Sequence, residues 1–312
     1  MKFVSYLKCL PPNNKNLEKN DILEKFPLGV AYLGLDEVII HEDSNIINAD
    51  VALMVGWVHE ESKDSQHLQF RKKIIDFQKS EGKRVLLADS NLFLYKNKSN
   101  PLHYLRYSFD GIFPNTGEYC DKNIDSGRWK KISQDIGLNL KDYRTNGNHI
   151  LLCLQRNGGW SMRGFDVIDW TAQTIKLLRL HTDRDIVIRA HPGDKGSKNY
   201  LSPNNLIKRI GLLKGVRLSK EGSELQDDLK NCWAVINHNS SPAVGAAIEG
   251  YPVFVTDAIR SQCYDIANTN LKNIENPNLP DRQKWIERIS MFHWKFDELV
   301  TGECWSHMRA YV

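Results

Sequence analysis

The sequence lacks the long apolar segments that membrane insertion and secretion require. No run approaches the ~18 apolar residues of a membrane span, and the N-terminal Met1–Lys8 contains no apolar core of a signal peptide. We therefore expect a cytoplasmic protein without an integral membrane segment. Only 11 of the 312 residues are proline and no low-complexity tract occurs, so most of the chain is expected to fold.

The sequence also lacks the residue patterns of metal and disulfide sites. Its six cysteines are scattered without any C-x-x-C pair, no His/Cys cluster has ligand spacing, and no Asp-x-Asp follows an expected strand. We expect reduced, mostly buried thiols and no catalytic metal ion. A strong excess of charge is missing as well. The net charge of +4 fits a partner that carries phosphate, but falls short of the lysine-rich stripe of a dedicated DNA-binding module.

What the chain does contain is a regular alternation of short apolar runs with amphipathic stretches. This alternation is typical of an α/β fold with mostly parallel sheets. In the first half it predicts one helix and five strands, at His67–Ser80 and at Lys2–Leu7, Val38–Ile40, Val51–Val58, Arg84–Ala88 and Gly111–Phe113. In the second half it predicts a helix and five more strands, at Phe165–His181 and at His149–Gln155, Asp185–Ala190, Val216–Leu218, Ala234–Asn237 and Pro252–Thr256.

A chain of this length suits two domains of roughly 150 residues each. The pattern loses its strands and becomes polar over Asp121–Asn148, which predicts a linker there. We therefore expect Rossmann-like domains at 1–145 and 146–280. The last segment, 281–312, is expected to form a helix that crosses back to the N-terminal domain.

In open parallel sheets, ligands bind at the carboxyl ends of the strands, so the residues after each apolar run are the site candidates. The first such motif is a strand that ends in His238-Asn239-Ser240-Ser241 and opens into a helix of small residues. Free backbone N–H groups and two hydroxyls at that position suit a phosphate. The alternative is that Ser240 only caps the helix.

The second motif is the strand that delivers Arg189 and the pair His191-Pro192 to the same edge. Proline restricts the preceding residue to extended geometry, so His191 is expected to point out of the strand end. There its imidazole would stabilise negative charge on a leaving phosphate, unless it is a structural histidine. The third motif is Arg156-Asn157-Gly158-Gly159, where Gly158 and Gly159 let the backbone approach a ligand and Arg156 reaches a phosphate, although paired glycines also occur in ordinary turns.

Together, the His-Pro strand and the Ser-Ser strand some fifty residues later resemble the bacterial sialyltransferase and capsular-polysaccharide glycosyltransferase group. The resemblance implies a GT-B fold, with two Rossmann-like domains whose parallel sheets face a central cleft. It implies that His191 and Ser240-Ser241 hold the phosphate of a nucleotide-sugar donor, and that Glu249 takes the place of a ribose-binding glutamate. It also implies that Asp110, before Gly111, is the general base.

An inverting transfer needs a base in the first domain, because the acceptor hydroxyl loses its proton as it attacks. Besides Asp110, the candidates are Asp89, which ends a clean apolar strand, and His59 and Glu60. Without metal ligands, stabilisation of the leaving group falls to His191, the Ser-Ser helix, and Arg156 or Arg189. No cofactor is expected beyond the nucleotide sugar itself, which is a co-substrate.

The sequence is compatible with more than one acceptor and more than one reaction class. A saccharide or glycolipid follows from the resemblance, whereas the basic residues between Lys72 and Lys98 allow a hydroxymethylated base in phage DNA. A nucleotide-sugar epimerase, which needs no acceptor, and a non-catalytic nucleotide-sugar-binding module would use the same phosphate motifs. The oligomeric state, the sugar and the nucleotide base do not follow from the sequence.

Overall fold

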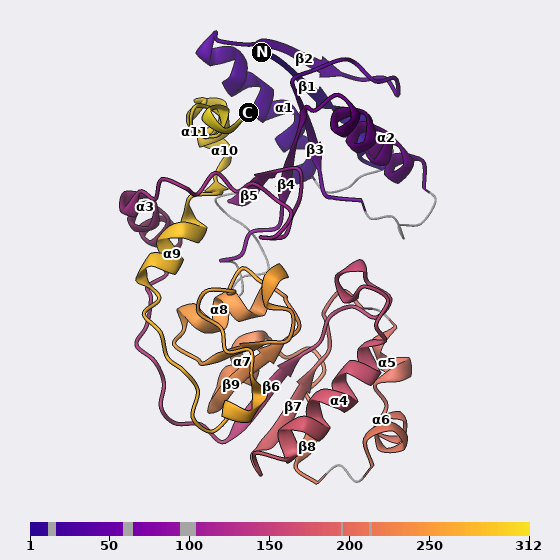
Figure 1. The fold of residues 1–312 in the computed structure, drawn as a ribbon, viewed down its shortest axis with the longest axis vertical. Helices are drawn as coiled ribbons and strands as arrows, with labels where there is room; N and C mark the ends of the chain where they lie inside the picture. Colours follow the sequence, from indigo (N-terminus) through magenta and orange to yellow (C-terminus); the bar gives the residue numbers. More distant parts are fainter. Residues whose placement is uncertain (12–16, 59–64, 94–103, 195, 212–213) are drawn as a thin grey trace. The chain divides into compact units, whose positions relative to one another are not determined.

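The computed structural model describes residues 1–11, 17–58, 65–93, 104–194, 196–211 and 214–312. The base candidates His59 and Glu60 lie outside these ranges. The chain divides into two compact units. Unit 1 comprises Met1–Leu92, Ser99–Gly137 and Glu287–Val312, and unit 2 comprises Phe93–Lys98 and Leu138–Ile286. Each unit is an α/β layer structure built on its own sheet (Figure 1).

Unit 1 contains a sheet in the order β11-β5-β4-β3-β1-β2. Its parallel strands are β1 (Lys2–Tyr6), β2 (Glu37–His41), β3 (Val51–Val55) and β4 (Arg84–Asp89). Strand β5 (Leu105–Phe109) runs antiparallel to β4, and β11 (His293–Trp294) runs antiparallel to β5. The sheet is therefore mixed at one side, where the C-terminal segment adds its edge strand.

Alternating residues of β1 fix which helix covers which face of this sheet. Phe3 stacks on Phe26 of α1 (Leu17–Leu33), with 5.6 Å between ring centroids. Tyr6 points to the other face, where its ring lies 5.7 Å from Phe70 of α2 (Gln66–Ser80). Unit 1 is completed by α3 (Ser126–Ile136), α10 (Phe296–Val300) and α11 (Glu303–Met308), and the chain enters it from unit 2 within α9 (Gln283–Ser290).

The C-terminal helices are held to unit 1 by one buried acid. The carboxylate of Asp36 accepts hydrogen bonds from Trp305 Nε1 at 2.8 Å and from Arg309 Nε at 2.9 Å, and it also pairs with the N-terminal amine at 2.9 Å. These hydrogen bonds and charges outweigh burial and hold the pKa of Asp36 far below its ordinary value. The ion pairs of this carboxylate thus join both ends of the chain to one unit.

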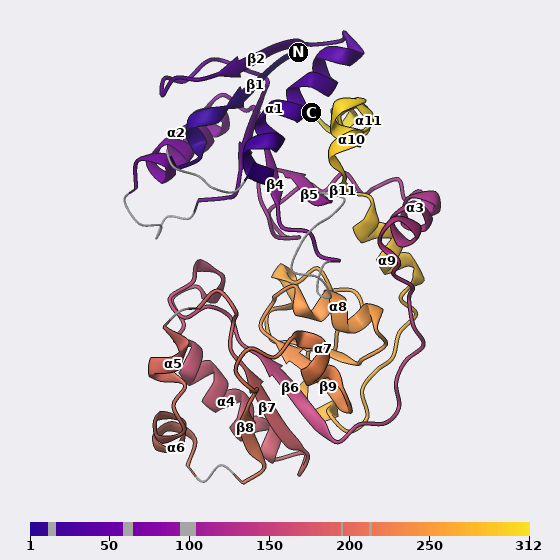
Figure 2. The same cartoon turned by 180° about the vertical axis from the view of Figure 1, so that it is seen from behind.

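Unit 2 contains a fully parallel sheet in the order β10-β9-β6-β7-β8. Its strands are β6 (His149–Cys153), β7 (Asp185–Arg189), β8 (Val216–Leu218), β9 (Cys232–Asn237) and β10 (Val253–Val255). Its helices are α4 (Val167–Arg179), α5 (Ser197–Tyr200), α6 (Pro203–Ile210), α7 (Leu225–Leu229) and α8 (Pro242–Ile248). Helices α4 and α7 lie on opposite faces of the sheet (Figures 1 and 2). The expected α/β class with mostly parallel sheets is confirmed.

One local prediction is wrong. The strand expected at Gly111–Phe113 is a turn, because β5 ends at Phe109 and Asp110 adopts a left-handed backbone with φ of 61°. The chain folds back so closely here that a Cβ on Gly111 would lie 2.5 Å from Thr116 Oγ1, and an extended strand does not make such a contact. The chain passes from unit 1 to unit 2 between Gly137 and Leu138, within the expected linker. This segment also contains α3, whose N-terminus is capped by Asp125 and whose C-terminus ends at the left-handed Gly137.

The six cysteines are free and buried. Within the described part of the chain, no helix combines the length and the apolar character that crossing a bilayer requires.

Candidate functional site

The carboxyl edge of the unit 2 sheet collects most of the residues that the sequence singled out. The chain begins this sheet in β6, continues outward through β7 and β8, and then crosses to β9 and β10 on the other side. The loops after β6 and β9 therefore leave the sheet in opposite directions, and open α/β sheets bind ligands at such a switch point. The side-chain amide of Gln155, after β6, donates a hydrogen bond to Asn239 Oδ1, after β9. Both side chains are buried, so these two loops are joined.

The loops after β6 and β7 are joined by Asp194. Its Oδ2 accepts hydrogen bonds from the Asn157 backbone N–H at 2.9 Å and from the Tyr200 hydroxyl, and its Oδ1 accepts one from the Gly196 N–H at 3.1 Å. Burial opposes the charge of Asp194, but these bonds outweigh it and lower the pKa of its carboxyl. The sequence had offered no signal for this role of Asp194.

Arg156 and His191 meet over the backbone of Gly193. A Cβ built on Gly193 would lie 2.7 Å from Arg156 Nη2 and 3.2 Å from His191 Cε1. The guanidinium and the imidazole thus lie side by side, and Gly193 leaves them the space. Two cationic or hydrogen-bond-donating groups at one strand edge form a suitable anion site.

The protonation state of His191 follows from its local bonds. Its Nδ1 accepts a hydrogen bond of 3.0 Å from the Gly193 N–H, so the neutral ring carries its proton on Nε2. Burial lowers the pKa of His191, and the nearby Arg156 lowers it further. Near neutral pH the side chain therefore presents an N–H donor rather than a full positive charge.

The loops after β9 and β10 form a second polar group. Trp170 Nε1 donates to Thr256 Oγ1 at 2.9 Å, and Thr256 Oγ1 lies 2.8 Å from His238 Nδ1. His238 Nε2 lies 3.6 Å from Asp257 Oδ2, which also accepts a hydrogen bond of 3.0 Å from Asn239 Nδ2. Burial lowers the pKa of His238, against the opposing charge of Asp257. The strand ends of the sequence indicate His238 and Asp257, but not Trp170 and Thr256, whose contacts with His238 depend on the packing of α4 and β10.

The Ser240-Ser241 turn follows directly. Asn237 Nδ2 donates to the Ser240 carbonyl at 3.2 Å and fixes the turn. Neither serine hydroxyl caps α8: Ser241, at the N-cap, makes no side-chain cap bond, and the buried Ser240 Oγ has no partner among the described residues. The helix-cap alternative for Ser240 is therefore not what the structure contains, and its hydroxyl is left with unused hydrogen-bonding capacity.

Two of the expected donor-binding residues form ion pairs within the protein. Arg189 Nη1 forms an ion pair of 2.6 Å with Asp228 Oδ2, so its charge is neutralised beside α7. Glu249 ends α8 at the opposite, amino-terminal side of the sheet, where its Oε2 lies 2.5 Å from Lys141 Nζ. Gly158 and Gly159 do lie in the turn after β6, where Gly158 has a left-handed φ of 64°.

In unit 1 the two acidic candidates occupy opposite edges of the sheet. Asp89 ends β4 at the carboxyl edge and forms an ion pair with Arg106 of β5. Asp110 lies at the start of β4: its Oδ1 accepts the Val85 N–H at 2.8 Å and its Oδ2 pairs with Arg84 at 2.7 Å. The structure therefore brings Asp89, and not Asp110, to the edge where ligands bind.

Three of the basic residues between Lys72 and Lys98 form ion pairs, and Lys96 and Lys98 lie outside the described residues. Lys72 lies 2.9 Å from Asp76, and Lys83 lies 3.4 Å from Asp50. With Arg84 on Asp110, these charges are balanced locally. Within the described ranges, no three histidine, cysteine, aspartate or glutamate side chains are grouped as a metal site requires.

No protein-family model matches the chain, and no curated protein matches it. Solved structures do. KpsC of Thermosulfurimonas dismutans, described as a beta Kdo 2,4 transferase, has a TM-score of 0.55 at 13% identity, over 96% of this chain and 98% of that one. The beta Kdo 2,7 transferase of the same organism has a TM-score of 0.51 at 14% identity, over 97% and 99% of the two chains. At this identity the likeness concerns the fold, and the expected GT-B fold is confirmed.

Proposed function

We propose that this chain is a glycosyltransferase that holds the phosphate of a nucleotide-sugar donor at the carboxyl edge of unit 2. The observation that carries the proposal is the pairing of Arg156 with His191 over Gly193, in a chain whose fold is similar along almost its full length to the two KpsC transferases. The Gln155–Asn239 bond joins the loop that carries Arg156 to the loop that carries Ser240. A guanidinium, an imidazole N–H and a hydroxyl without a partner are the groups that bind phosphate oxygens.

The chemistry assigned to these groups is stabilisation of the leaving group. In the transfer, the bond between the anomeric carbon and the phosphate oxygen breaks, and its electron pair stays on the phosphate. Arg156 offsets that charge, while His191 donates its Nε2–H to the departing oxygen. We propose that these groups act without a metal ion, so that EDTA leaves donor binding and turnover unchanged.

The acceptor oxygen forms the new bond on the opposite face of the sugar and loses its proton to a base. We propose Asp89 as that base, since it is the described acidic candidate at a carboxyl edge. His59 and Glu60 lie outside the described residues and stay predictions. A saccharide or glycolipid is the proposed acceptor, and retention of duplex DNA in a gel at low salt would identify the DNA alternative instead.

Thermal stabilisation by ligands tests the donor site. A nucleotide or nucleotide sugar present at ~100 times its dissociation constant adds about 2.7 kcal/mol to the free energy of unfolding. We expect one member of a panel of cytidine, uridine, guanosine, adenosine and thymidine nucleotides and sugars to stabilise the protein. His191→Ala and Arg156→Ala should abolish that shift, whereas His67→Ala and Arg217→Ala, on helix α2 and strand β8, should preserve it.

Turnover of the stabilising donor then distinguishes a transferase from an epimerase and from a non-catalytic binding module. A transferase consumes the donor faster when the correct acceptor is added, an epimerase converts it without any acceptor, and a binding module leaves it unchanged. The absence of any shift over the whole panel would refute the proposed donor site.

A further inference from the structure

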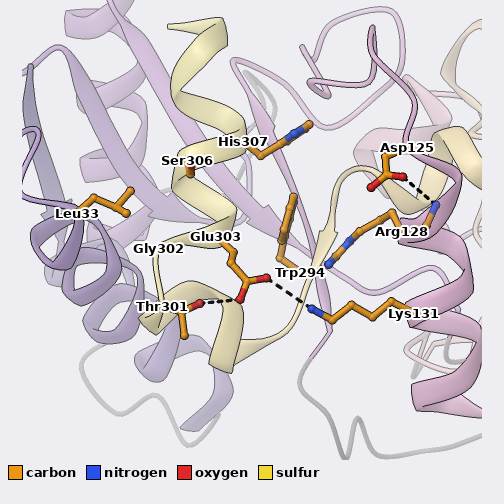
Figure 3. Close-up of a pocket in the computed structure, with 11 residues that line it drawn as sticks. Leu33, Asp125, Arg128, Lys131, Trp294, Thr301, Gly302, Glu303, Ser306 and His307 are labelled. Carbon is orange, nitrogen blue, oxygen red and sulfur yellow. Dashed lines mark hydrogen bonds and ion pairs between the residues drawn. The ribbon is translucent and has the colours of Figure 1, made fainter.

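A second candidate site lies in unit 1, at residues to which the proposed transfer assigns no role. An open hollow of about 720 Å³ is bounded by α3 on one side and by α11 and the turn before it on the other. Its lining includes Arg128, Lys131, Trp294, Glu303, Ser306 and His307 (Figure 3). Its volume falls within the ~300–1,000 Å³ of small-molecule sites.

Arg128, Trp294 and His307 pack together in the lining of the hollow, which we call its floor. The Arg128 guanidinium lies 3.9 Å from the centroid of the Trp294 ring, and the His307 ring centroid lies 5.4 Å from it. Both Arg128 and Trp294 are buried, and Arg128 is fixed by Glu298 through bonds of 2.5 and 2.7 Å. Because the buried ion pair with Glu298 already holds Arg128 against Trp294, little conformational entropy is lost when a ligand binds, and this favours binding.

Two donors of this floor have unused hydrogen-bonding capacity. In the part of the chain that the structure describes, Trp294 Nε1 and Arg128 Nε are buried and have no acceptor. An unsatisfied buried donor costs about 1–3 kcal/mol, and native proteins contain few of them. Both residues contribute to the lining of the hollow.

The rim adds alternating donors and acceptors. Thr301 Oγ1 lies 3.1 Å from Glu303 Oε1, and Lys131 Nζ lies 3.5 Å from Glu303 Oε2 (Figure 3). The exposed hydroxyl of Ser306 lies on the same side of the hollow. Neighbouring hydroxyl groups of a sugar donate and accept in the same alternating manner, so this rim matches a polyhydroxylated ligand.

The charges of the lining select among such ligands. The positive charges of Arg128 and Lys131 are balanced by Glu298 and Glu303, and Asp125 adds another negative charge. No positive excess therefore remains to attract an anion. Leu33 and Trp294 are the apolar side chains of the lining, which is too little for an acyl chain.

We propose that this hollow binds a neutral saccharide chain through its hydroxyl groups. The site is separate from the donor phosphate groups of unit 2, and its occupancy requires neither nucleotide nor turnover. Its failure and the failure of the proposed glycosyl transfer are therefore measured independently.

Titration calorimetry of the full chain with maltohexaose, cellohexaose and chitohexaose tests the proposal. We expect at least one of these oligosaccharides to bind with a dissociation constant of about 1 mM or below. Ser306→Arg fills the hollow from an exposed helix position and should weaken that binding at least tenfold. Gln134→Arg adds the same charge to an exposed position of α3 outside the lining and should leave it unchanged.

Glu303→Gln keeps the shape of the rim and removes one charge, and should weaken binding several-fold without shifting the melting temperature. The proposal is overturned if none of the three oligosaccharides binds below about 10 mM, if Ser306→Arg binds as the unchanged protein does, or if an anionic oligosaccharide such as oligosialic acid binds more tightly than the neutral ones.

Discussion

The backbone N–H of Asn157 donates a hydrogen bond of 2.9 Å to Oδ2 of Asp194, 37 residues further along the chain. This bond joins the loop that carries Arg156 to the loop that carries His191. Because the hydrogen bonds to Asp194 outweigh its burial and lower the pKa of its carboxyl, the acid is ionised at neutral pH and retains these contacts down to pH values below its ordinary pKa.

Replacing Asp194 should uncouple the two loops. Asp194→Ala leaves the Asn157 and Gly196 amides without their acceptor, so we expect the free energy of unfolding to fall by about 1–3 kcal/mol. We also expect at least tenfold weaker binding of the nucleotide identified by thermal stabilisation, measured by calorimetry. The exposed Asp43→Ala is the matched control, and equal binding by both variants would contradict the role of Asp194 in joining the two loops.

Gly193→Ala should weaken nucleotide binding without lowering the stability of the fold. The added Cβ meets the end of the flexible Arg156 side chain, which is free to move away, so the melting temperature should change by no more than about 1 °C. The displaced guanidinium should weaken nucleotide binding about tenfold, which corresponds to 1.4 kcal/mol. Unchanged affinity would mean that Arg156 does not contact the nucleotide.

Asp89→Asn and Asp110→Asn should have different effects on turnover. If Asp89 is the base, its amide variant loses about 10²- to 10⁴-fold in kcat with little change in donor affinity. Asp110→Asn tolerates the left-handed backbone and should retain turnover. Rates of nucleotide release with the identified donor and acceptor measure both. The reverse pattern would return the base to Asp110.

His293 should make stability depend on pH. Its ring is fully buried between the Ile289 carbonyl, 2.7 Å from Nδ1, and the Leu92 N–H, 3.2 Å from Nε2, and burial lowers its pKa to about 3. The unfolded chain binds a proton near pH 6.5, so this stabilisation is complete above that value and decreases as the pH falls toward 3.

We expect the free energy of unfolding to decrease by up to about 1.4 kcal/mol per pH unit in that window from this group alone. His293→Asn should be less stable at pH 7.5 and should show a correspondingly flatter pH dependence in urea unfolding. An unchanged slope would show that His293 is accessible to protons in the folded protein.

The main ligand motifs could be predicted because parallel strands impose order on a sequence. A short apolar run followed by a polar residue marks the carboxyl end of a buried strand, and all such ends in one sheet share an edge. Arg156, His191, His238 and Ser240 were found in this way. Glu249 and Asp110, which follow from a family pattern rather than from a strand end, lie away from the carboxyl edges of their sheets and form ion pairs with Lys141 and Arg84.

The amino-acid sequence by itself determined the α/β class and the strand ends of unit 2, because hydrophobic periodicity is local. The tertiary structure alone decided that Asp194 joins two loops, that Arg189 is neutralised by Asp228, and that Asp89 and Asp110 lie at opposite edges of one sheet. It also decided that Trp294 stacks with Arg128, 166 positions earlier in the chain, to form the floor of the unit 1 hollow. Such pairings depend on how distant segments pack, and no local pattern of residue types encodes a contact across that separation.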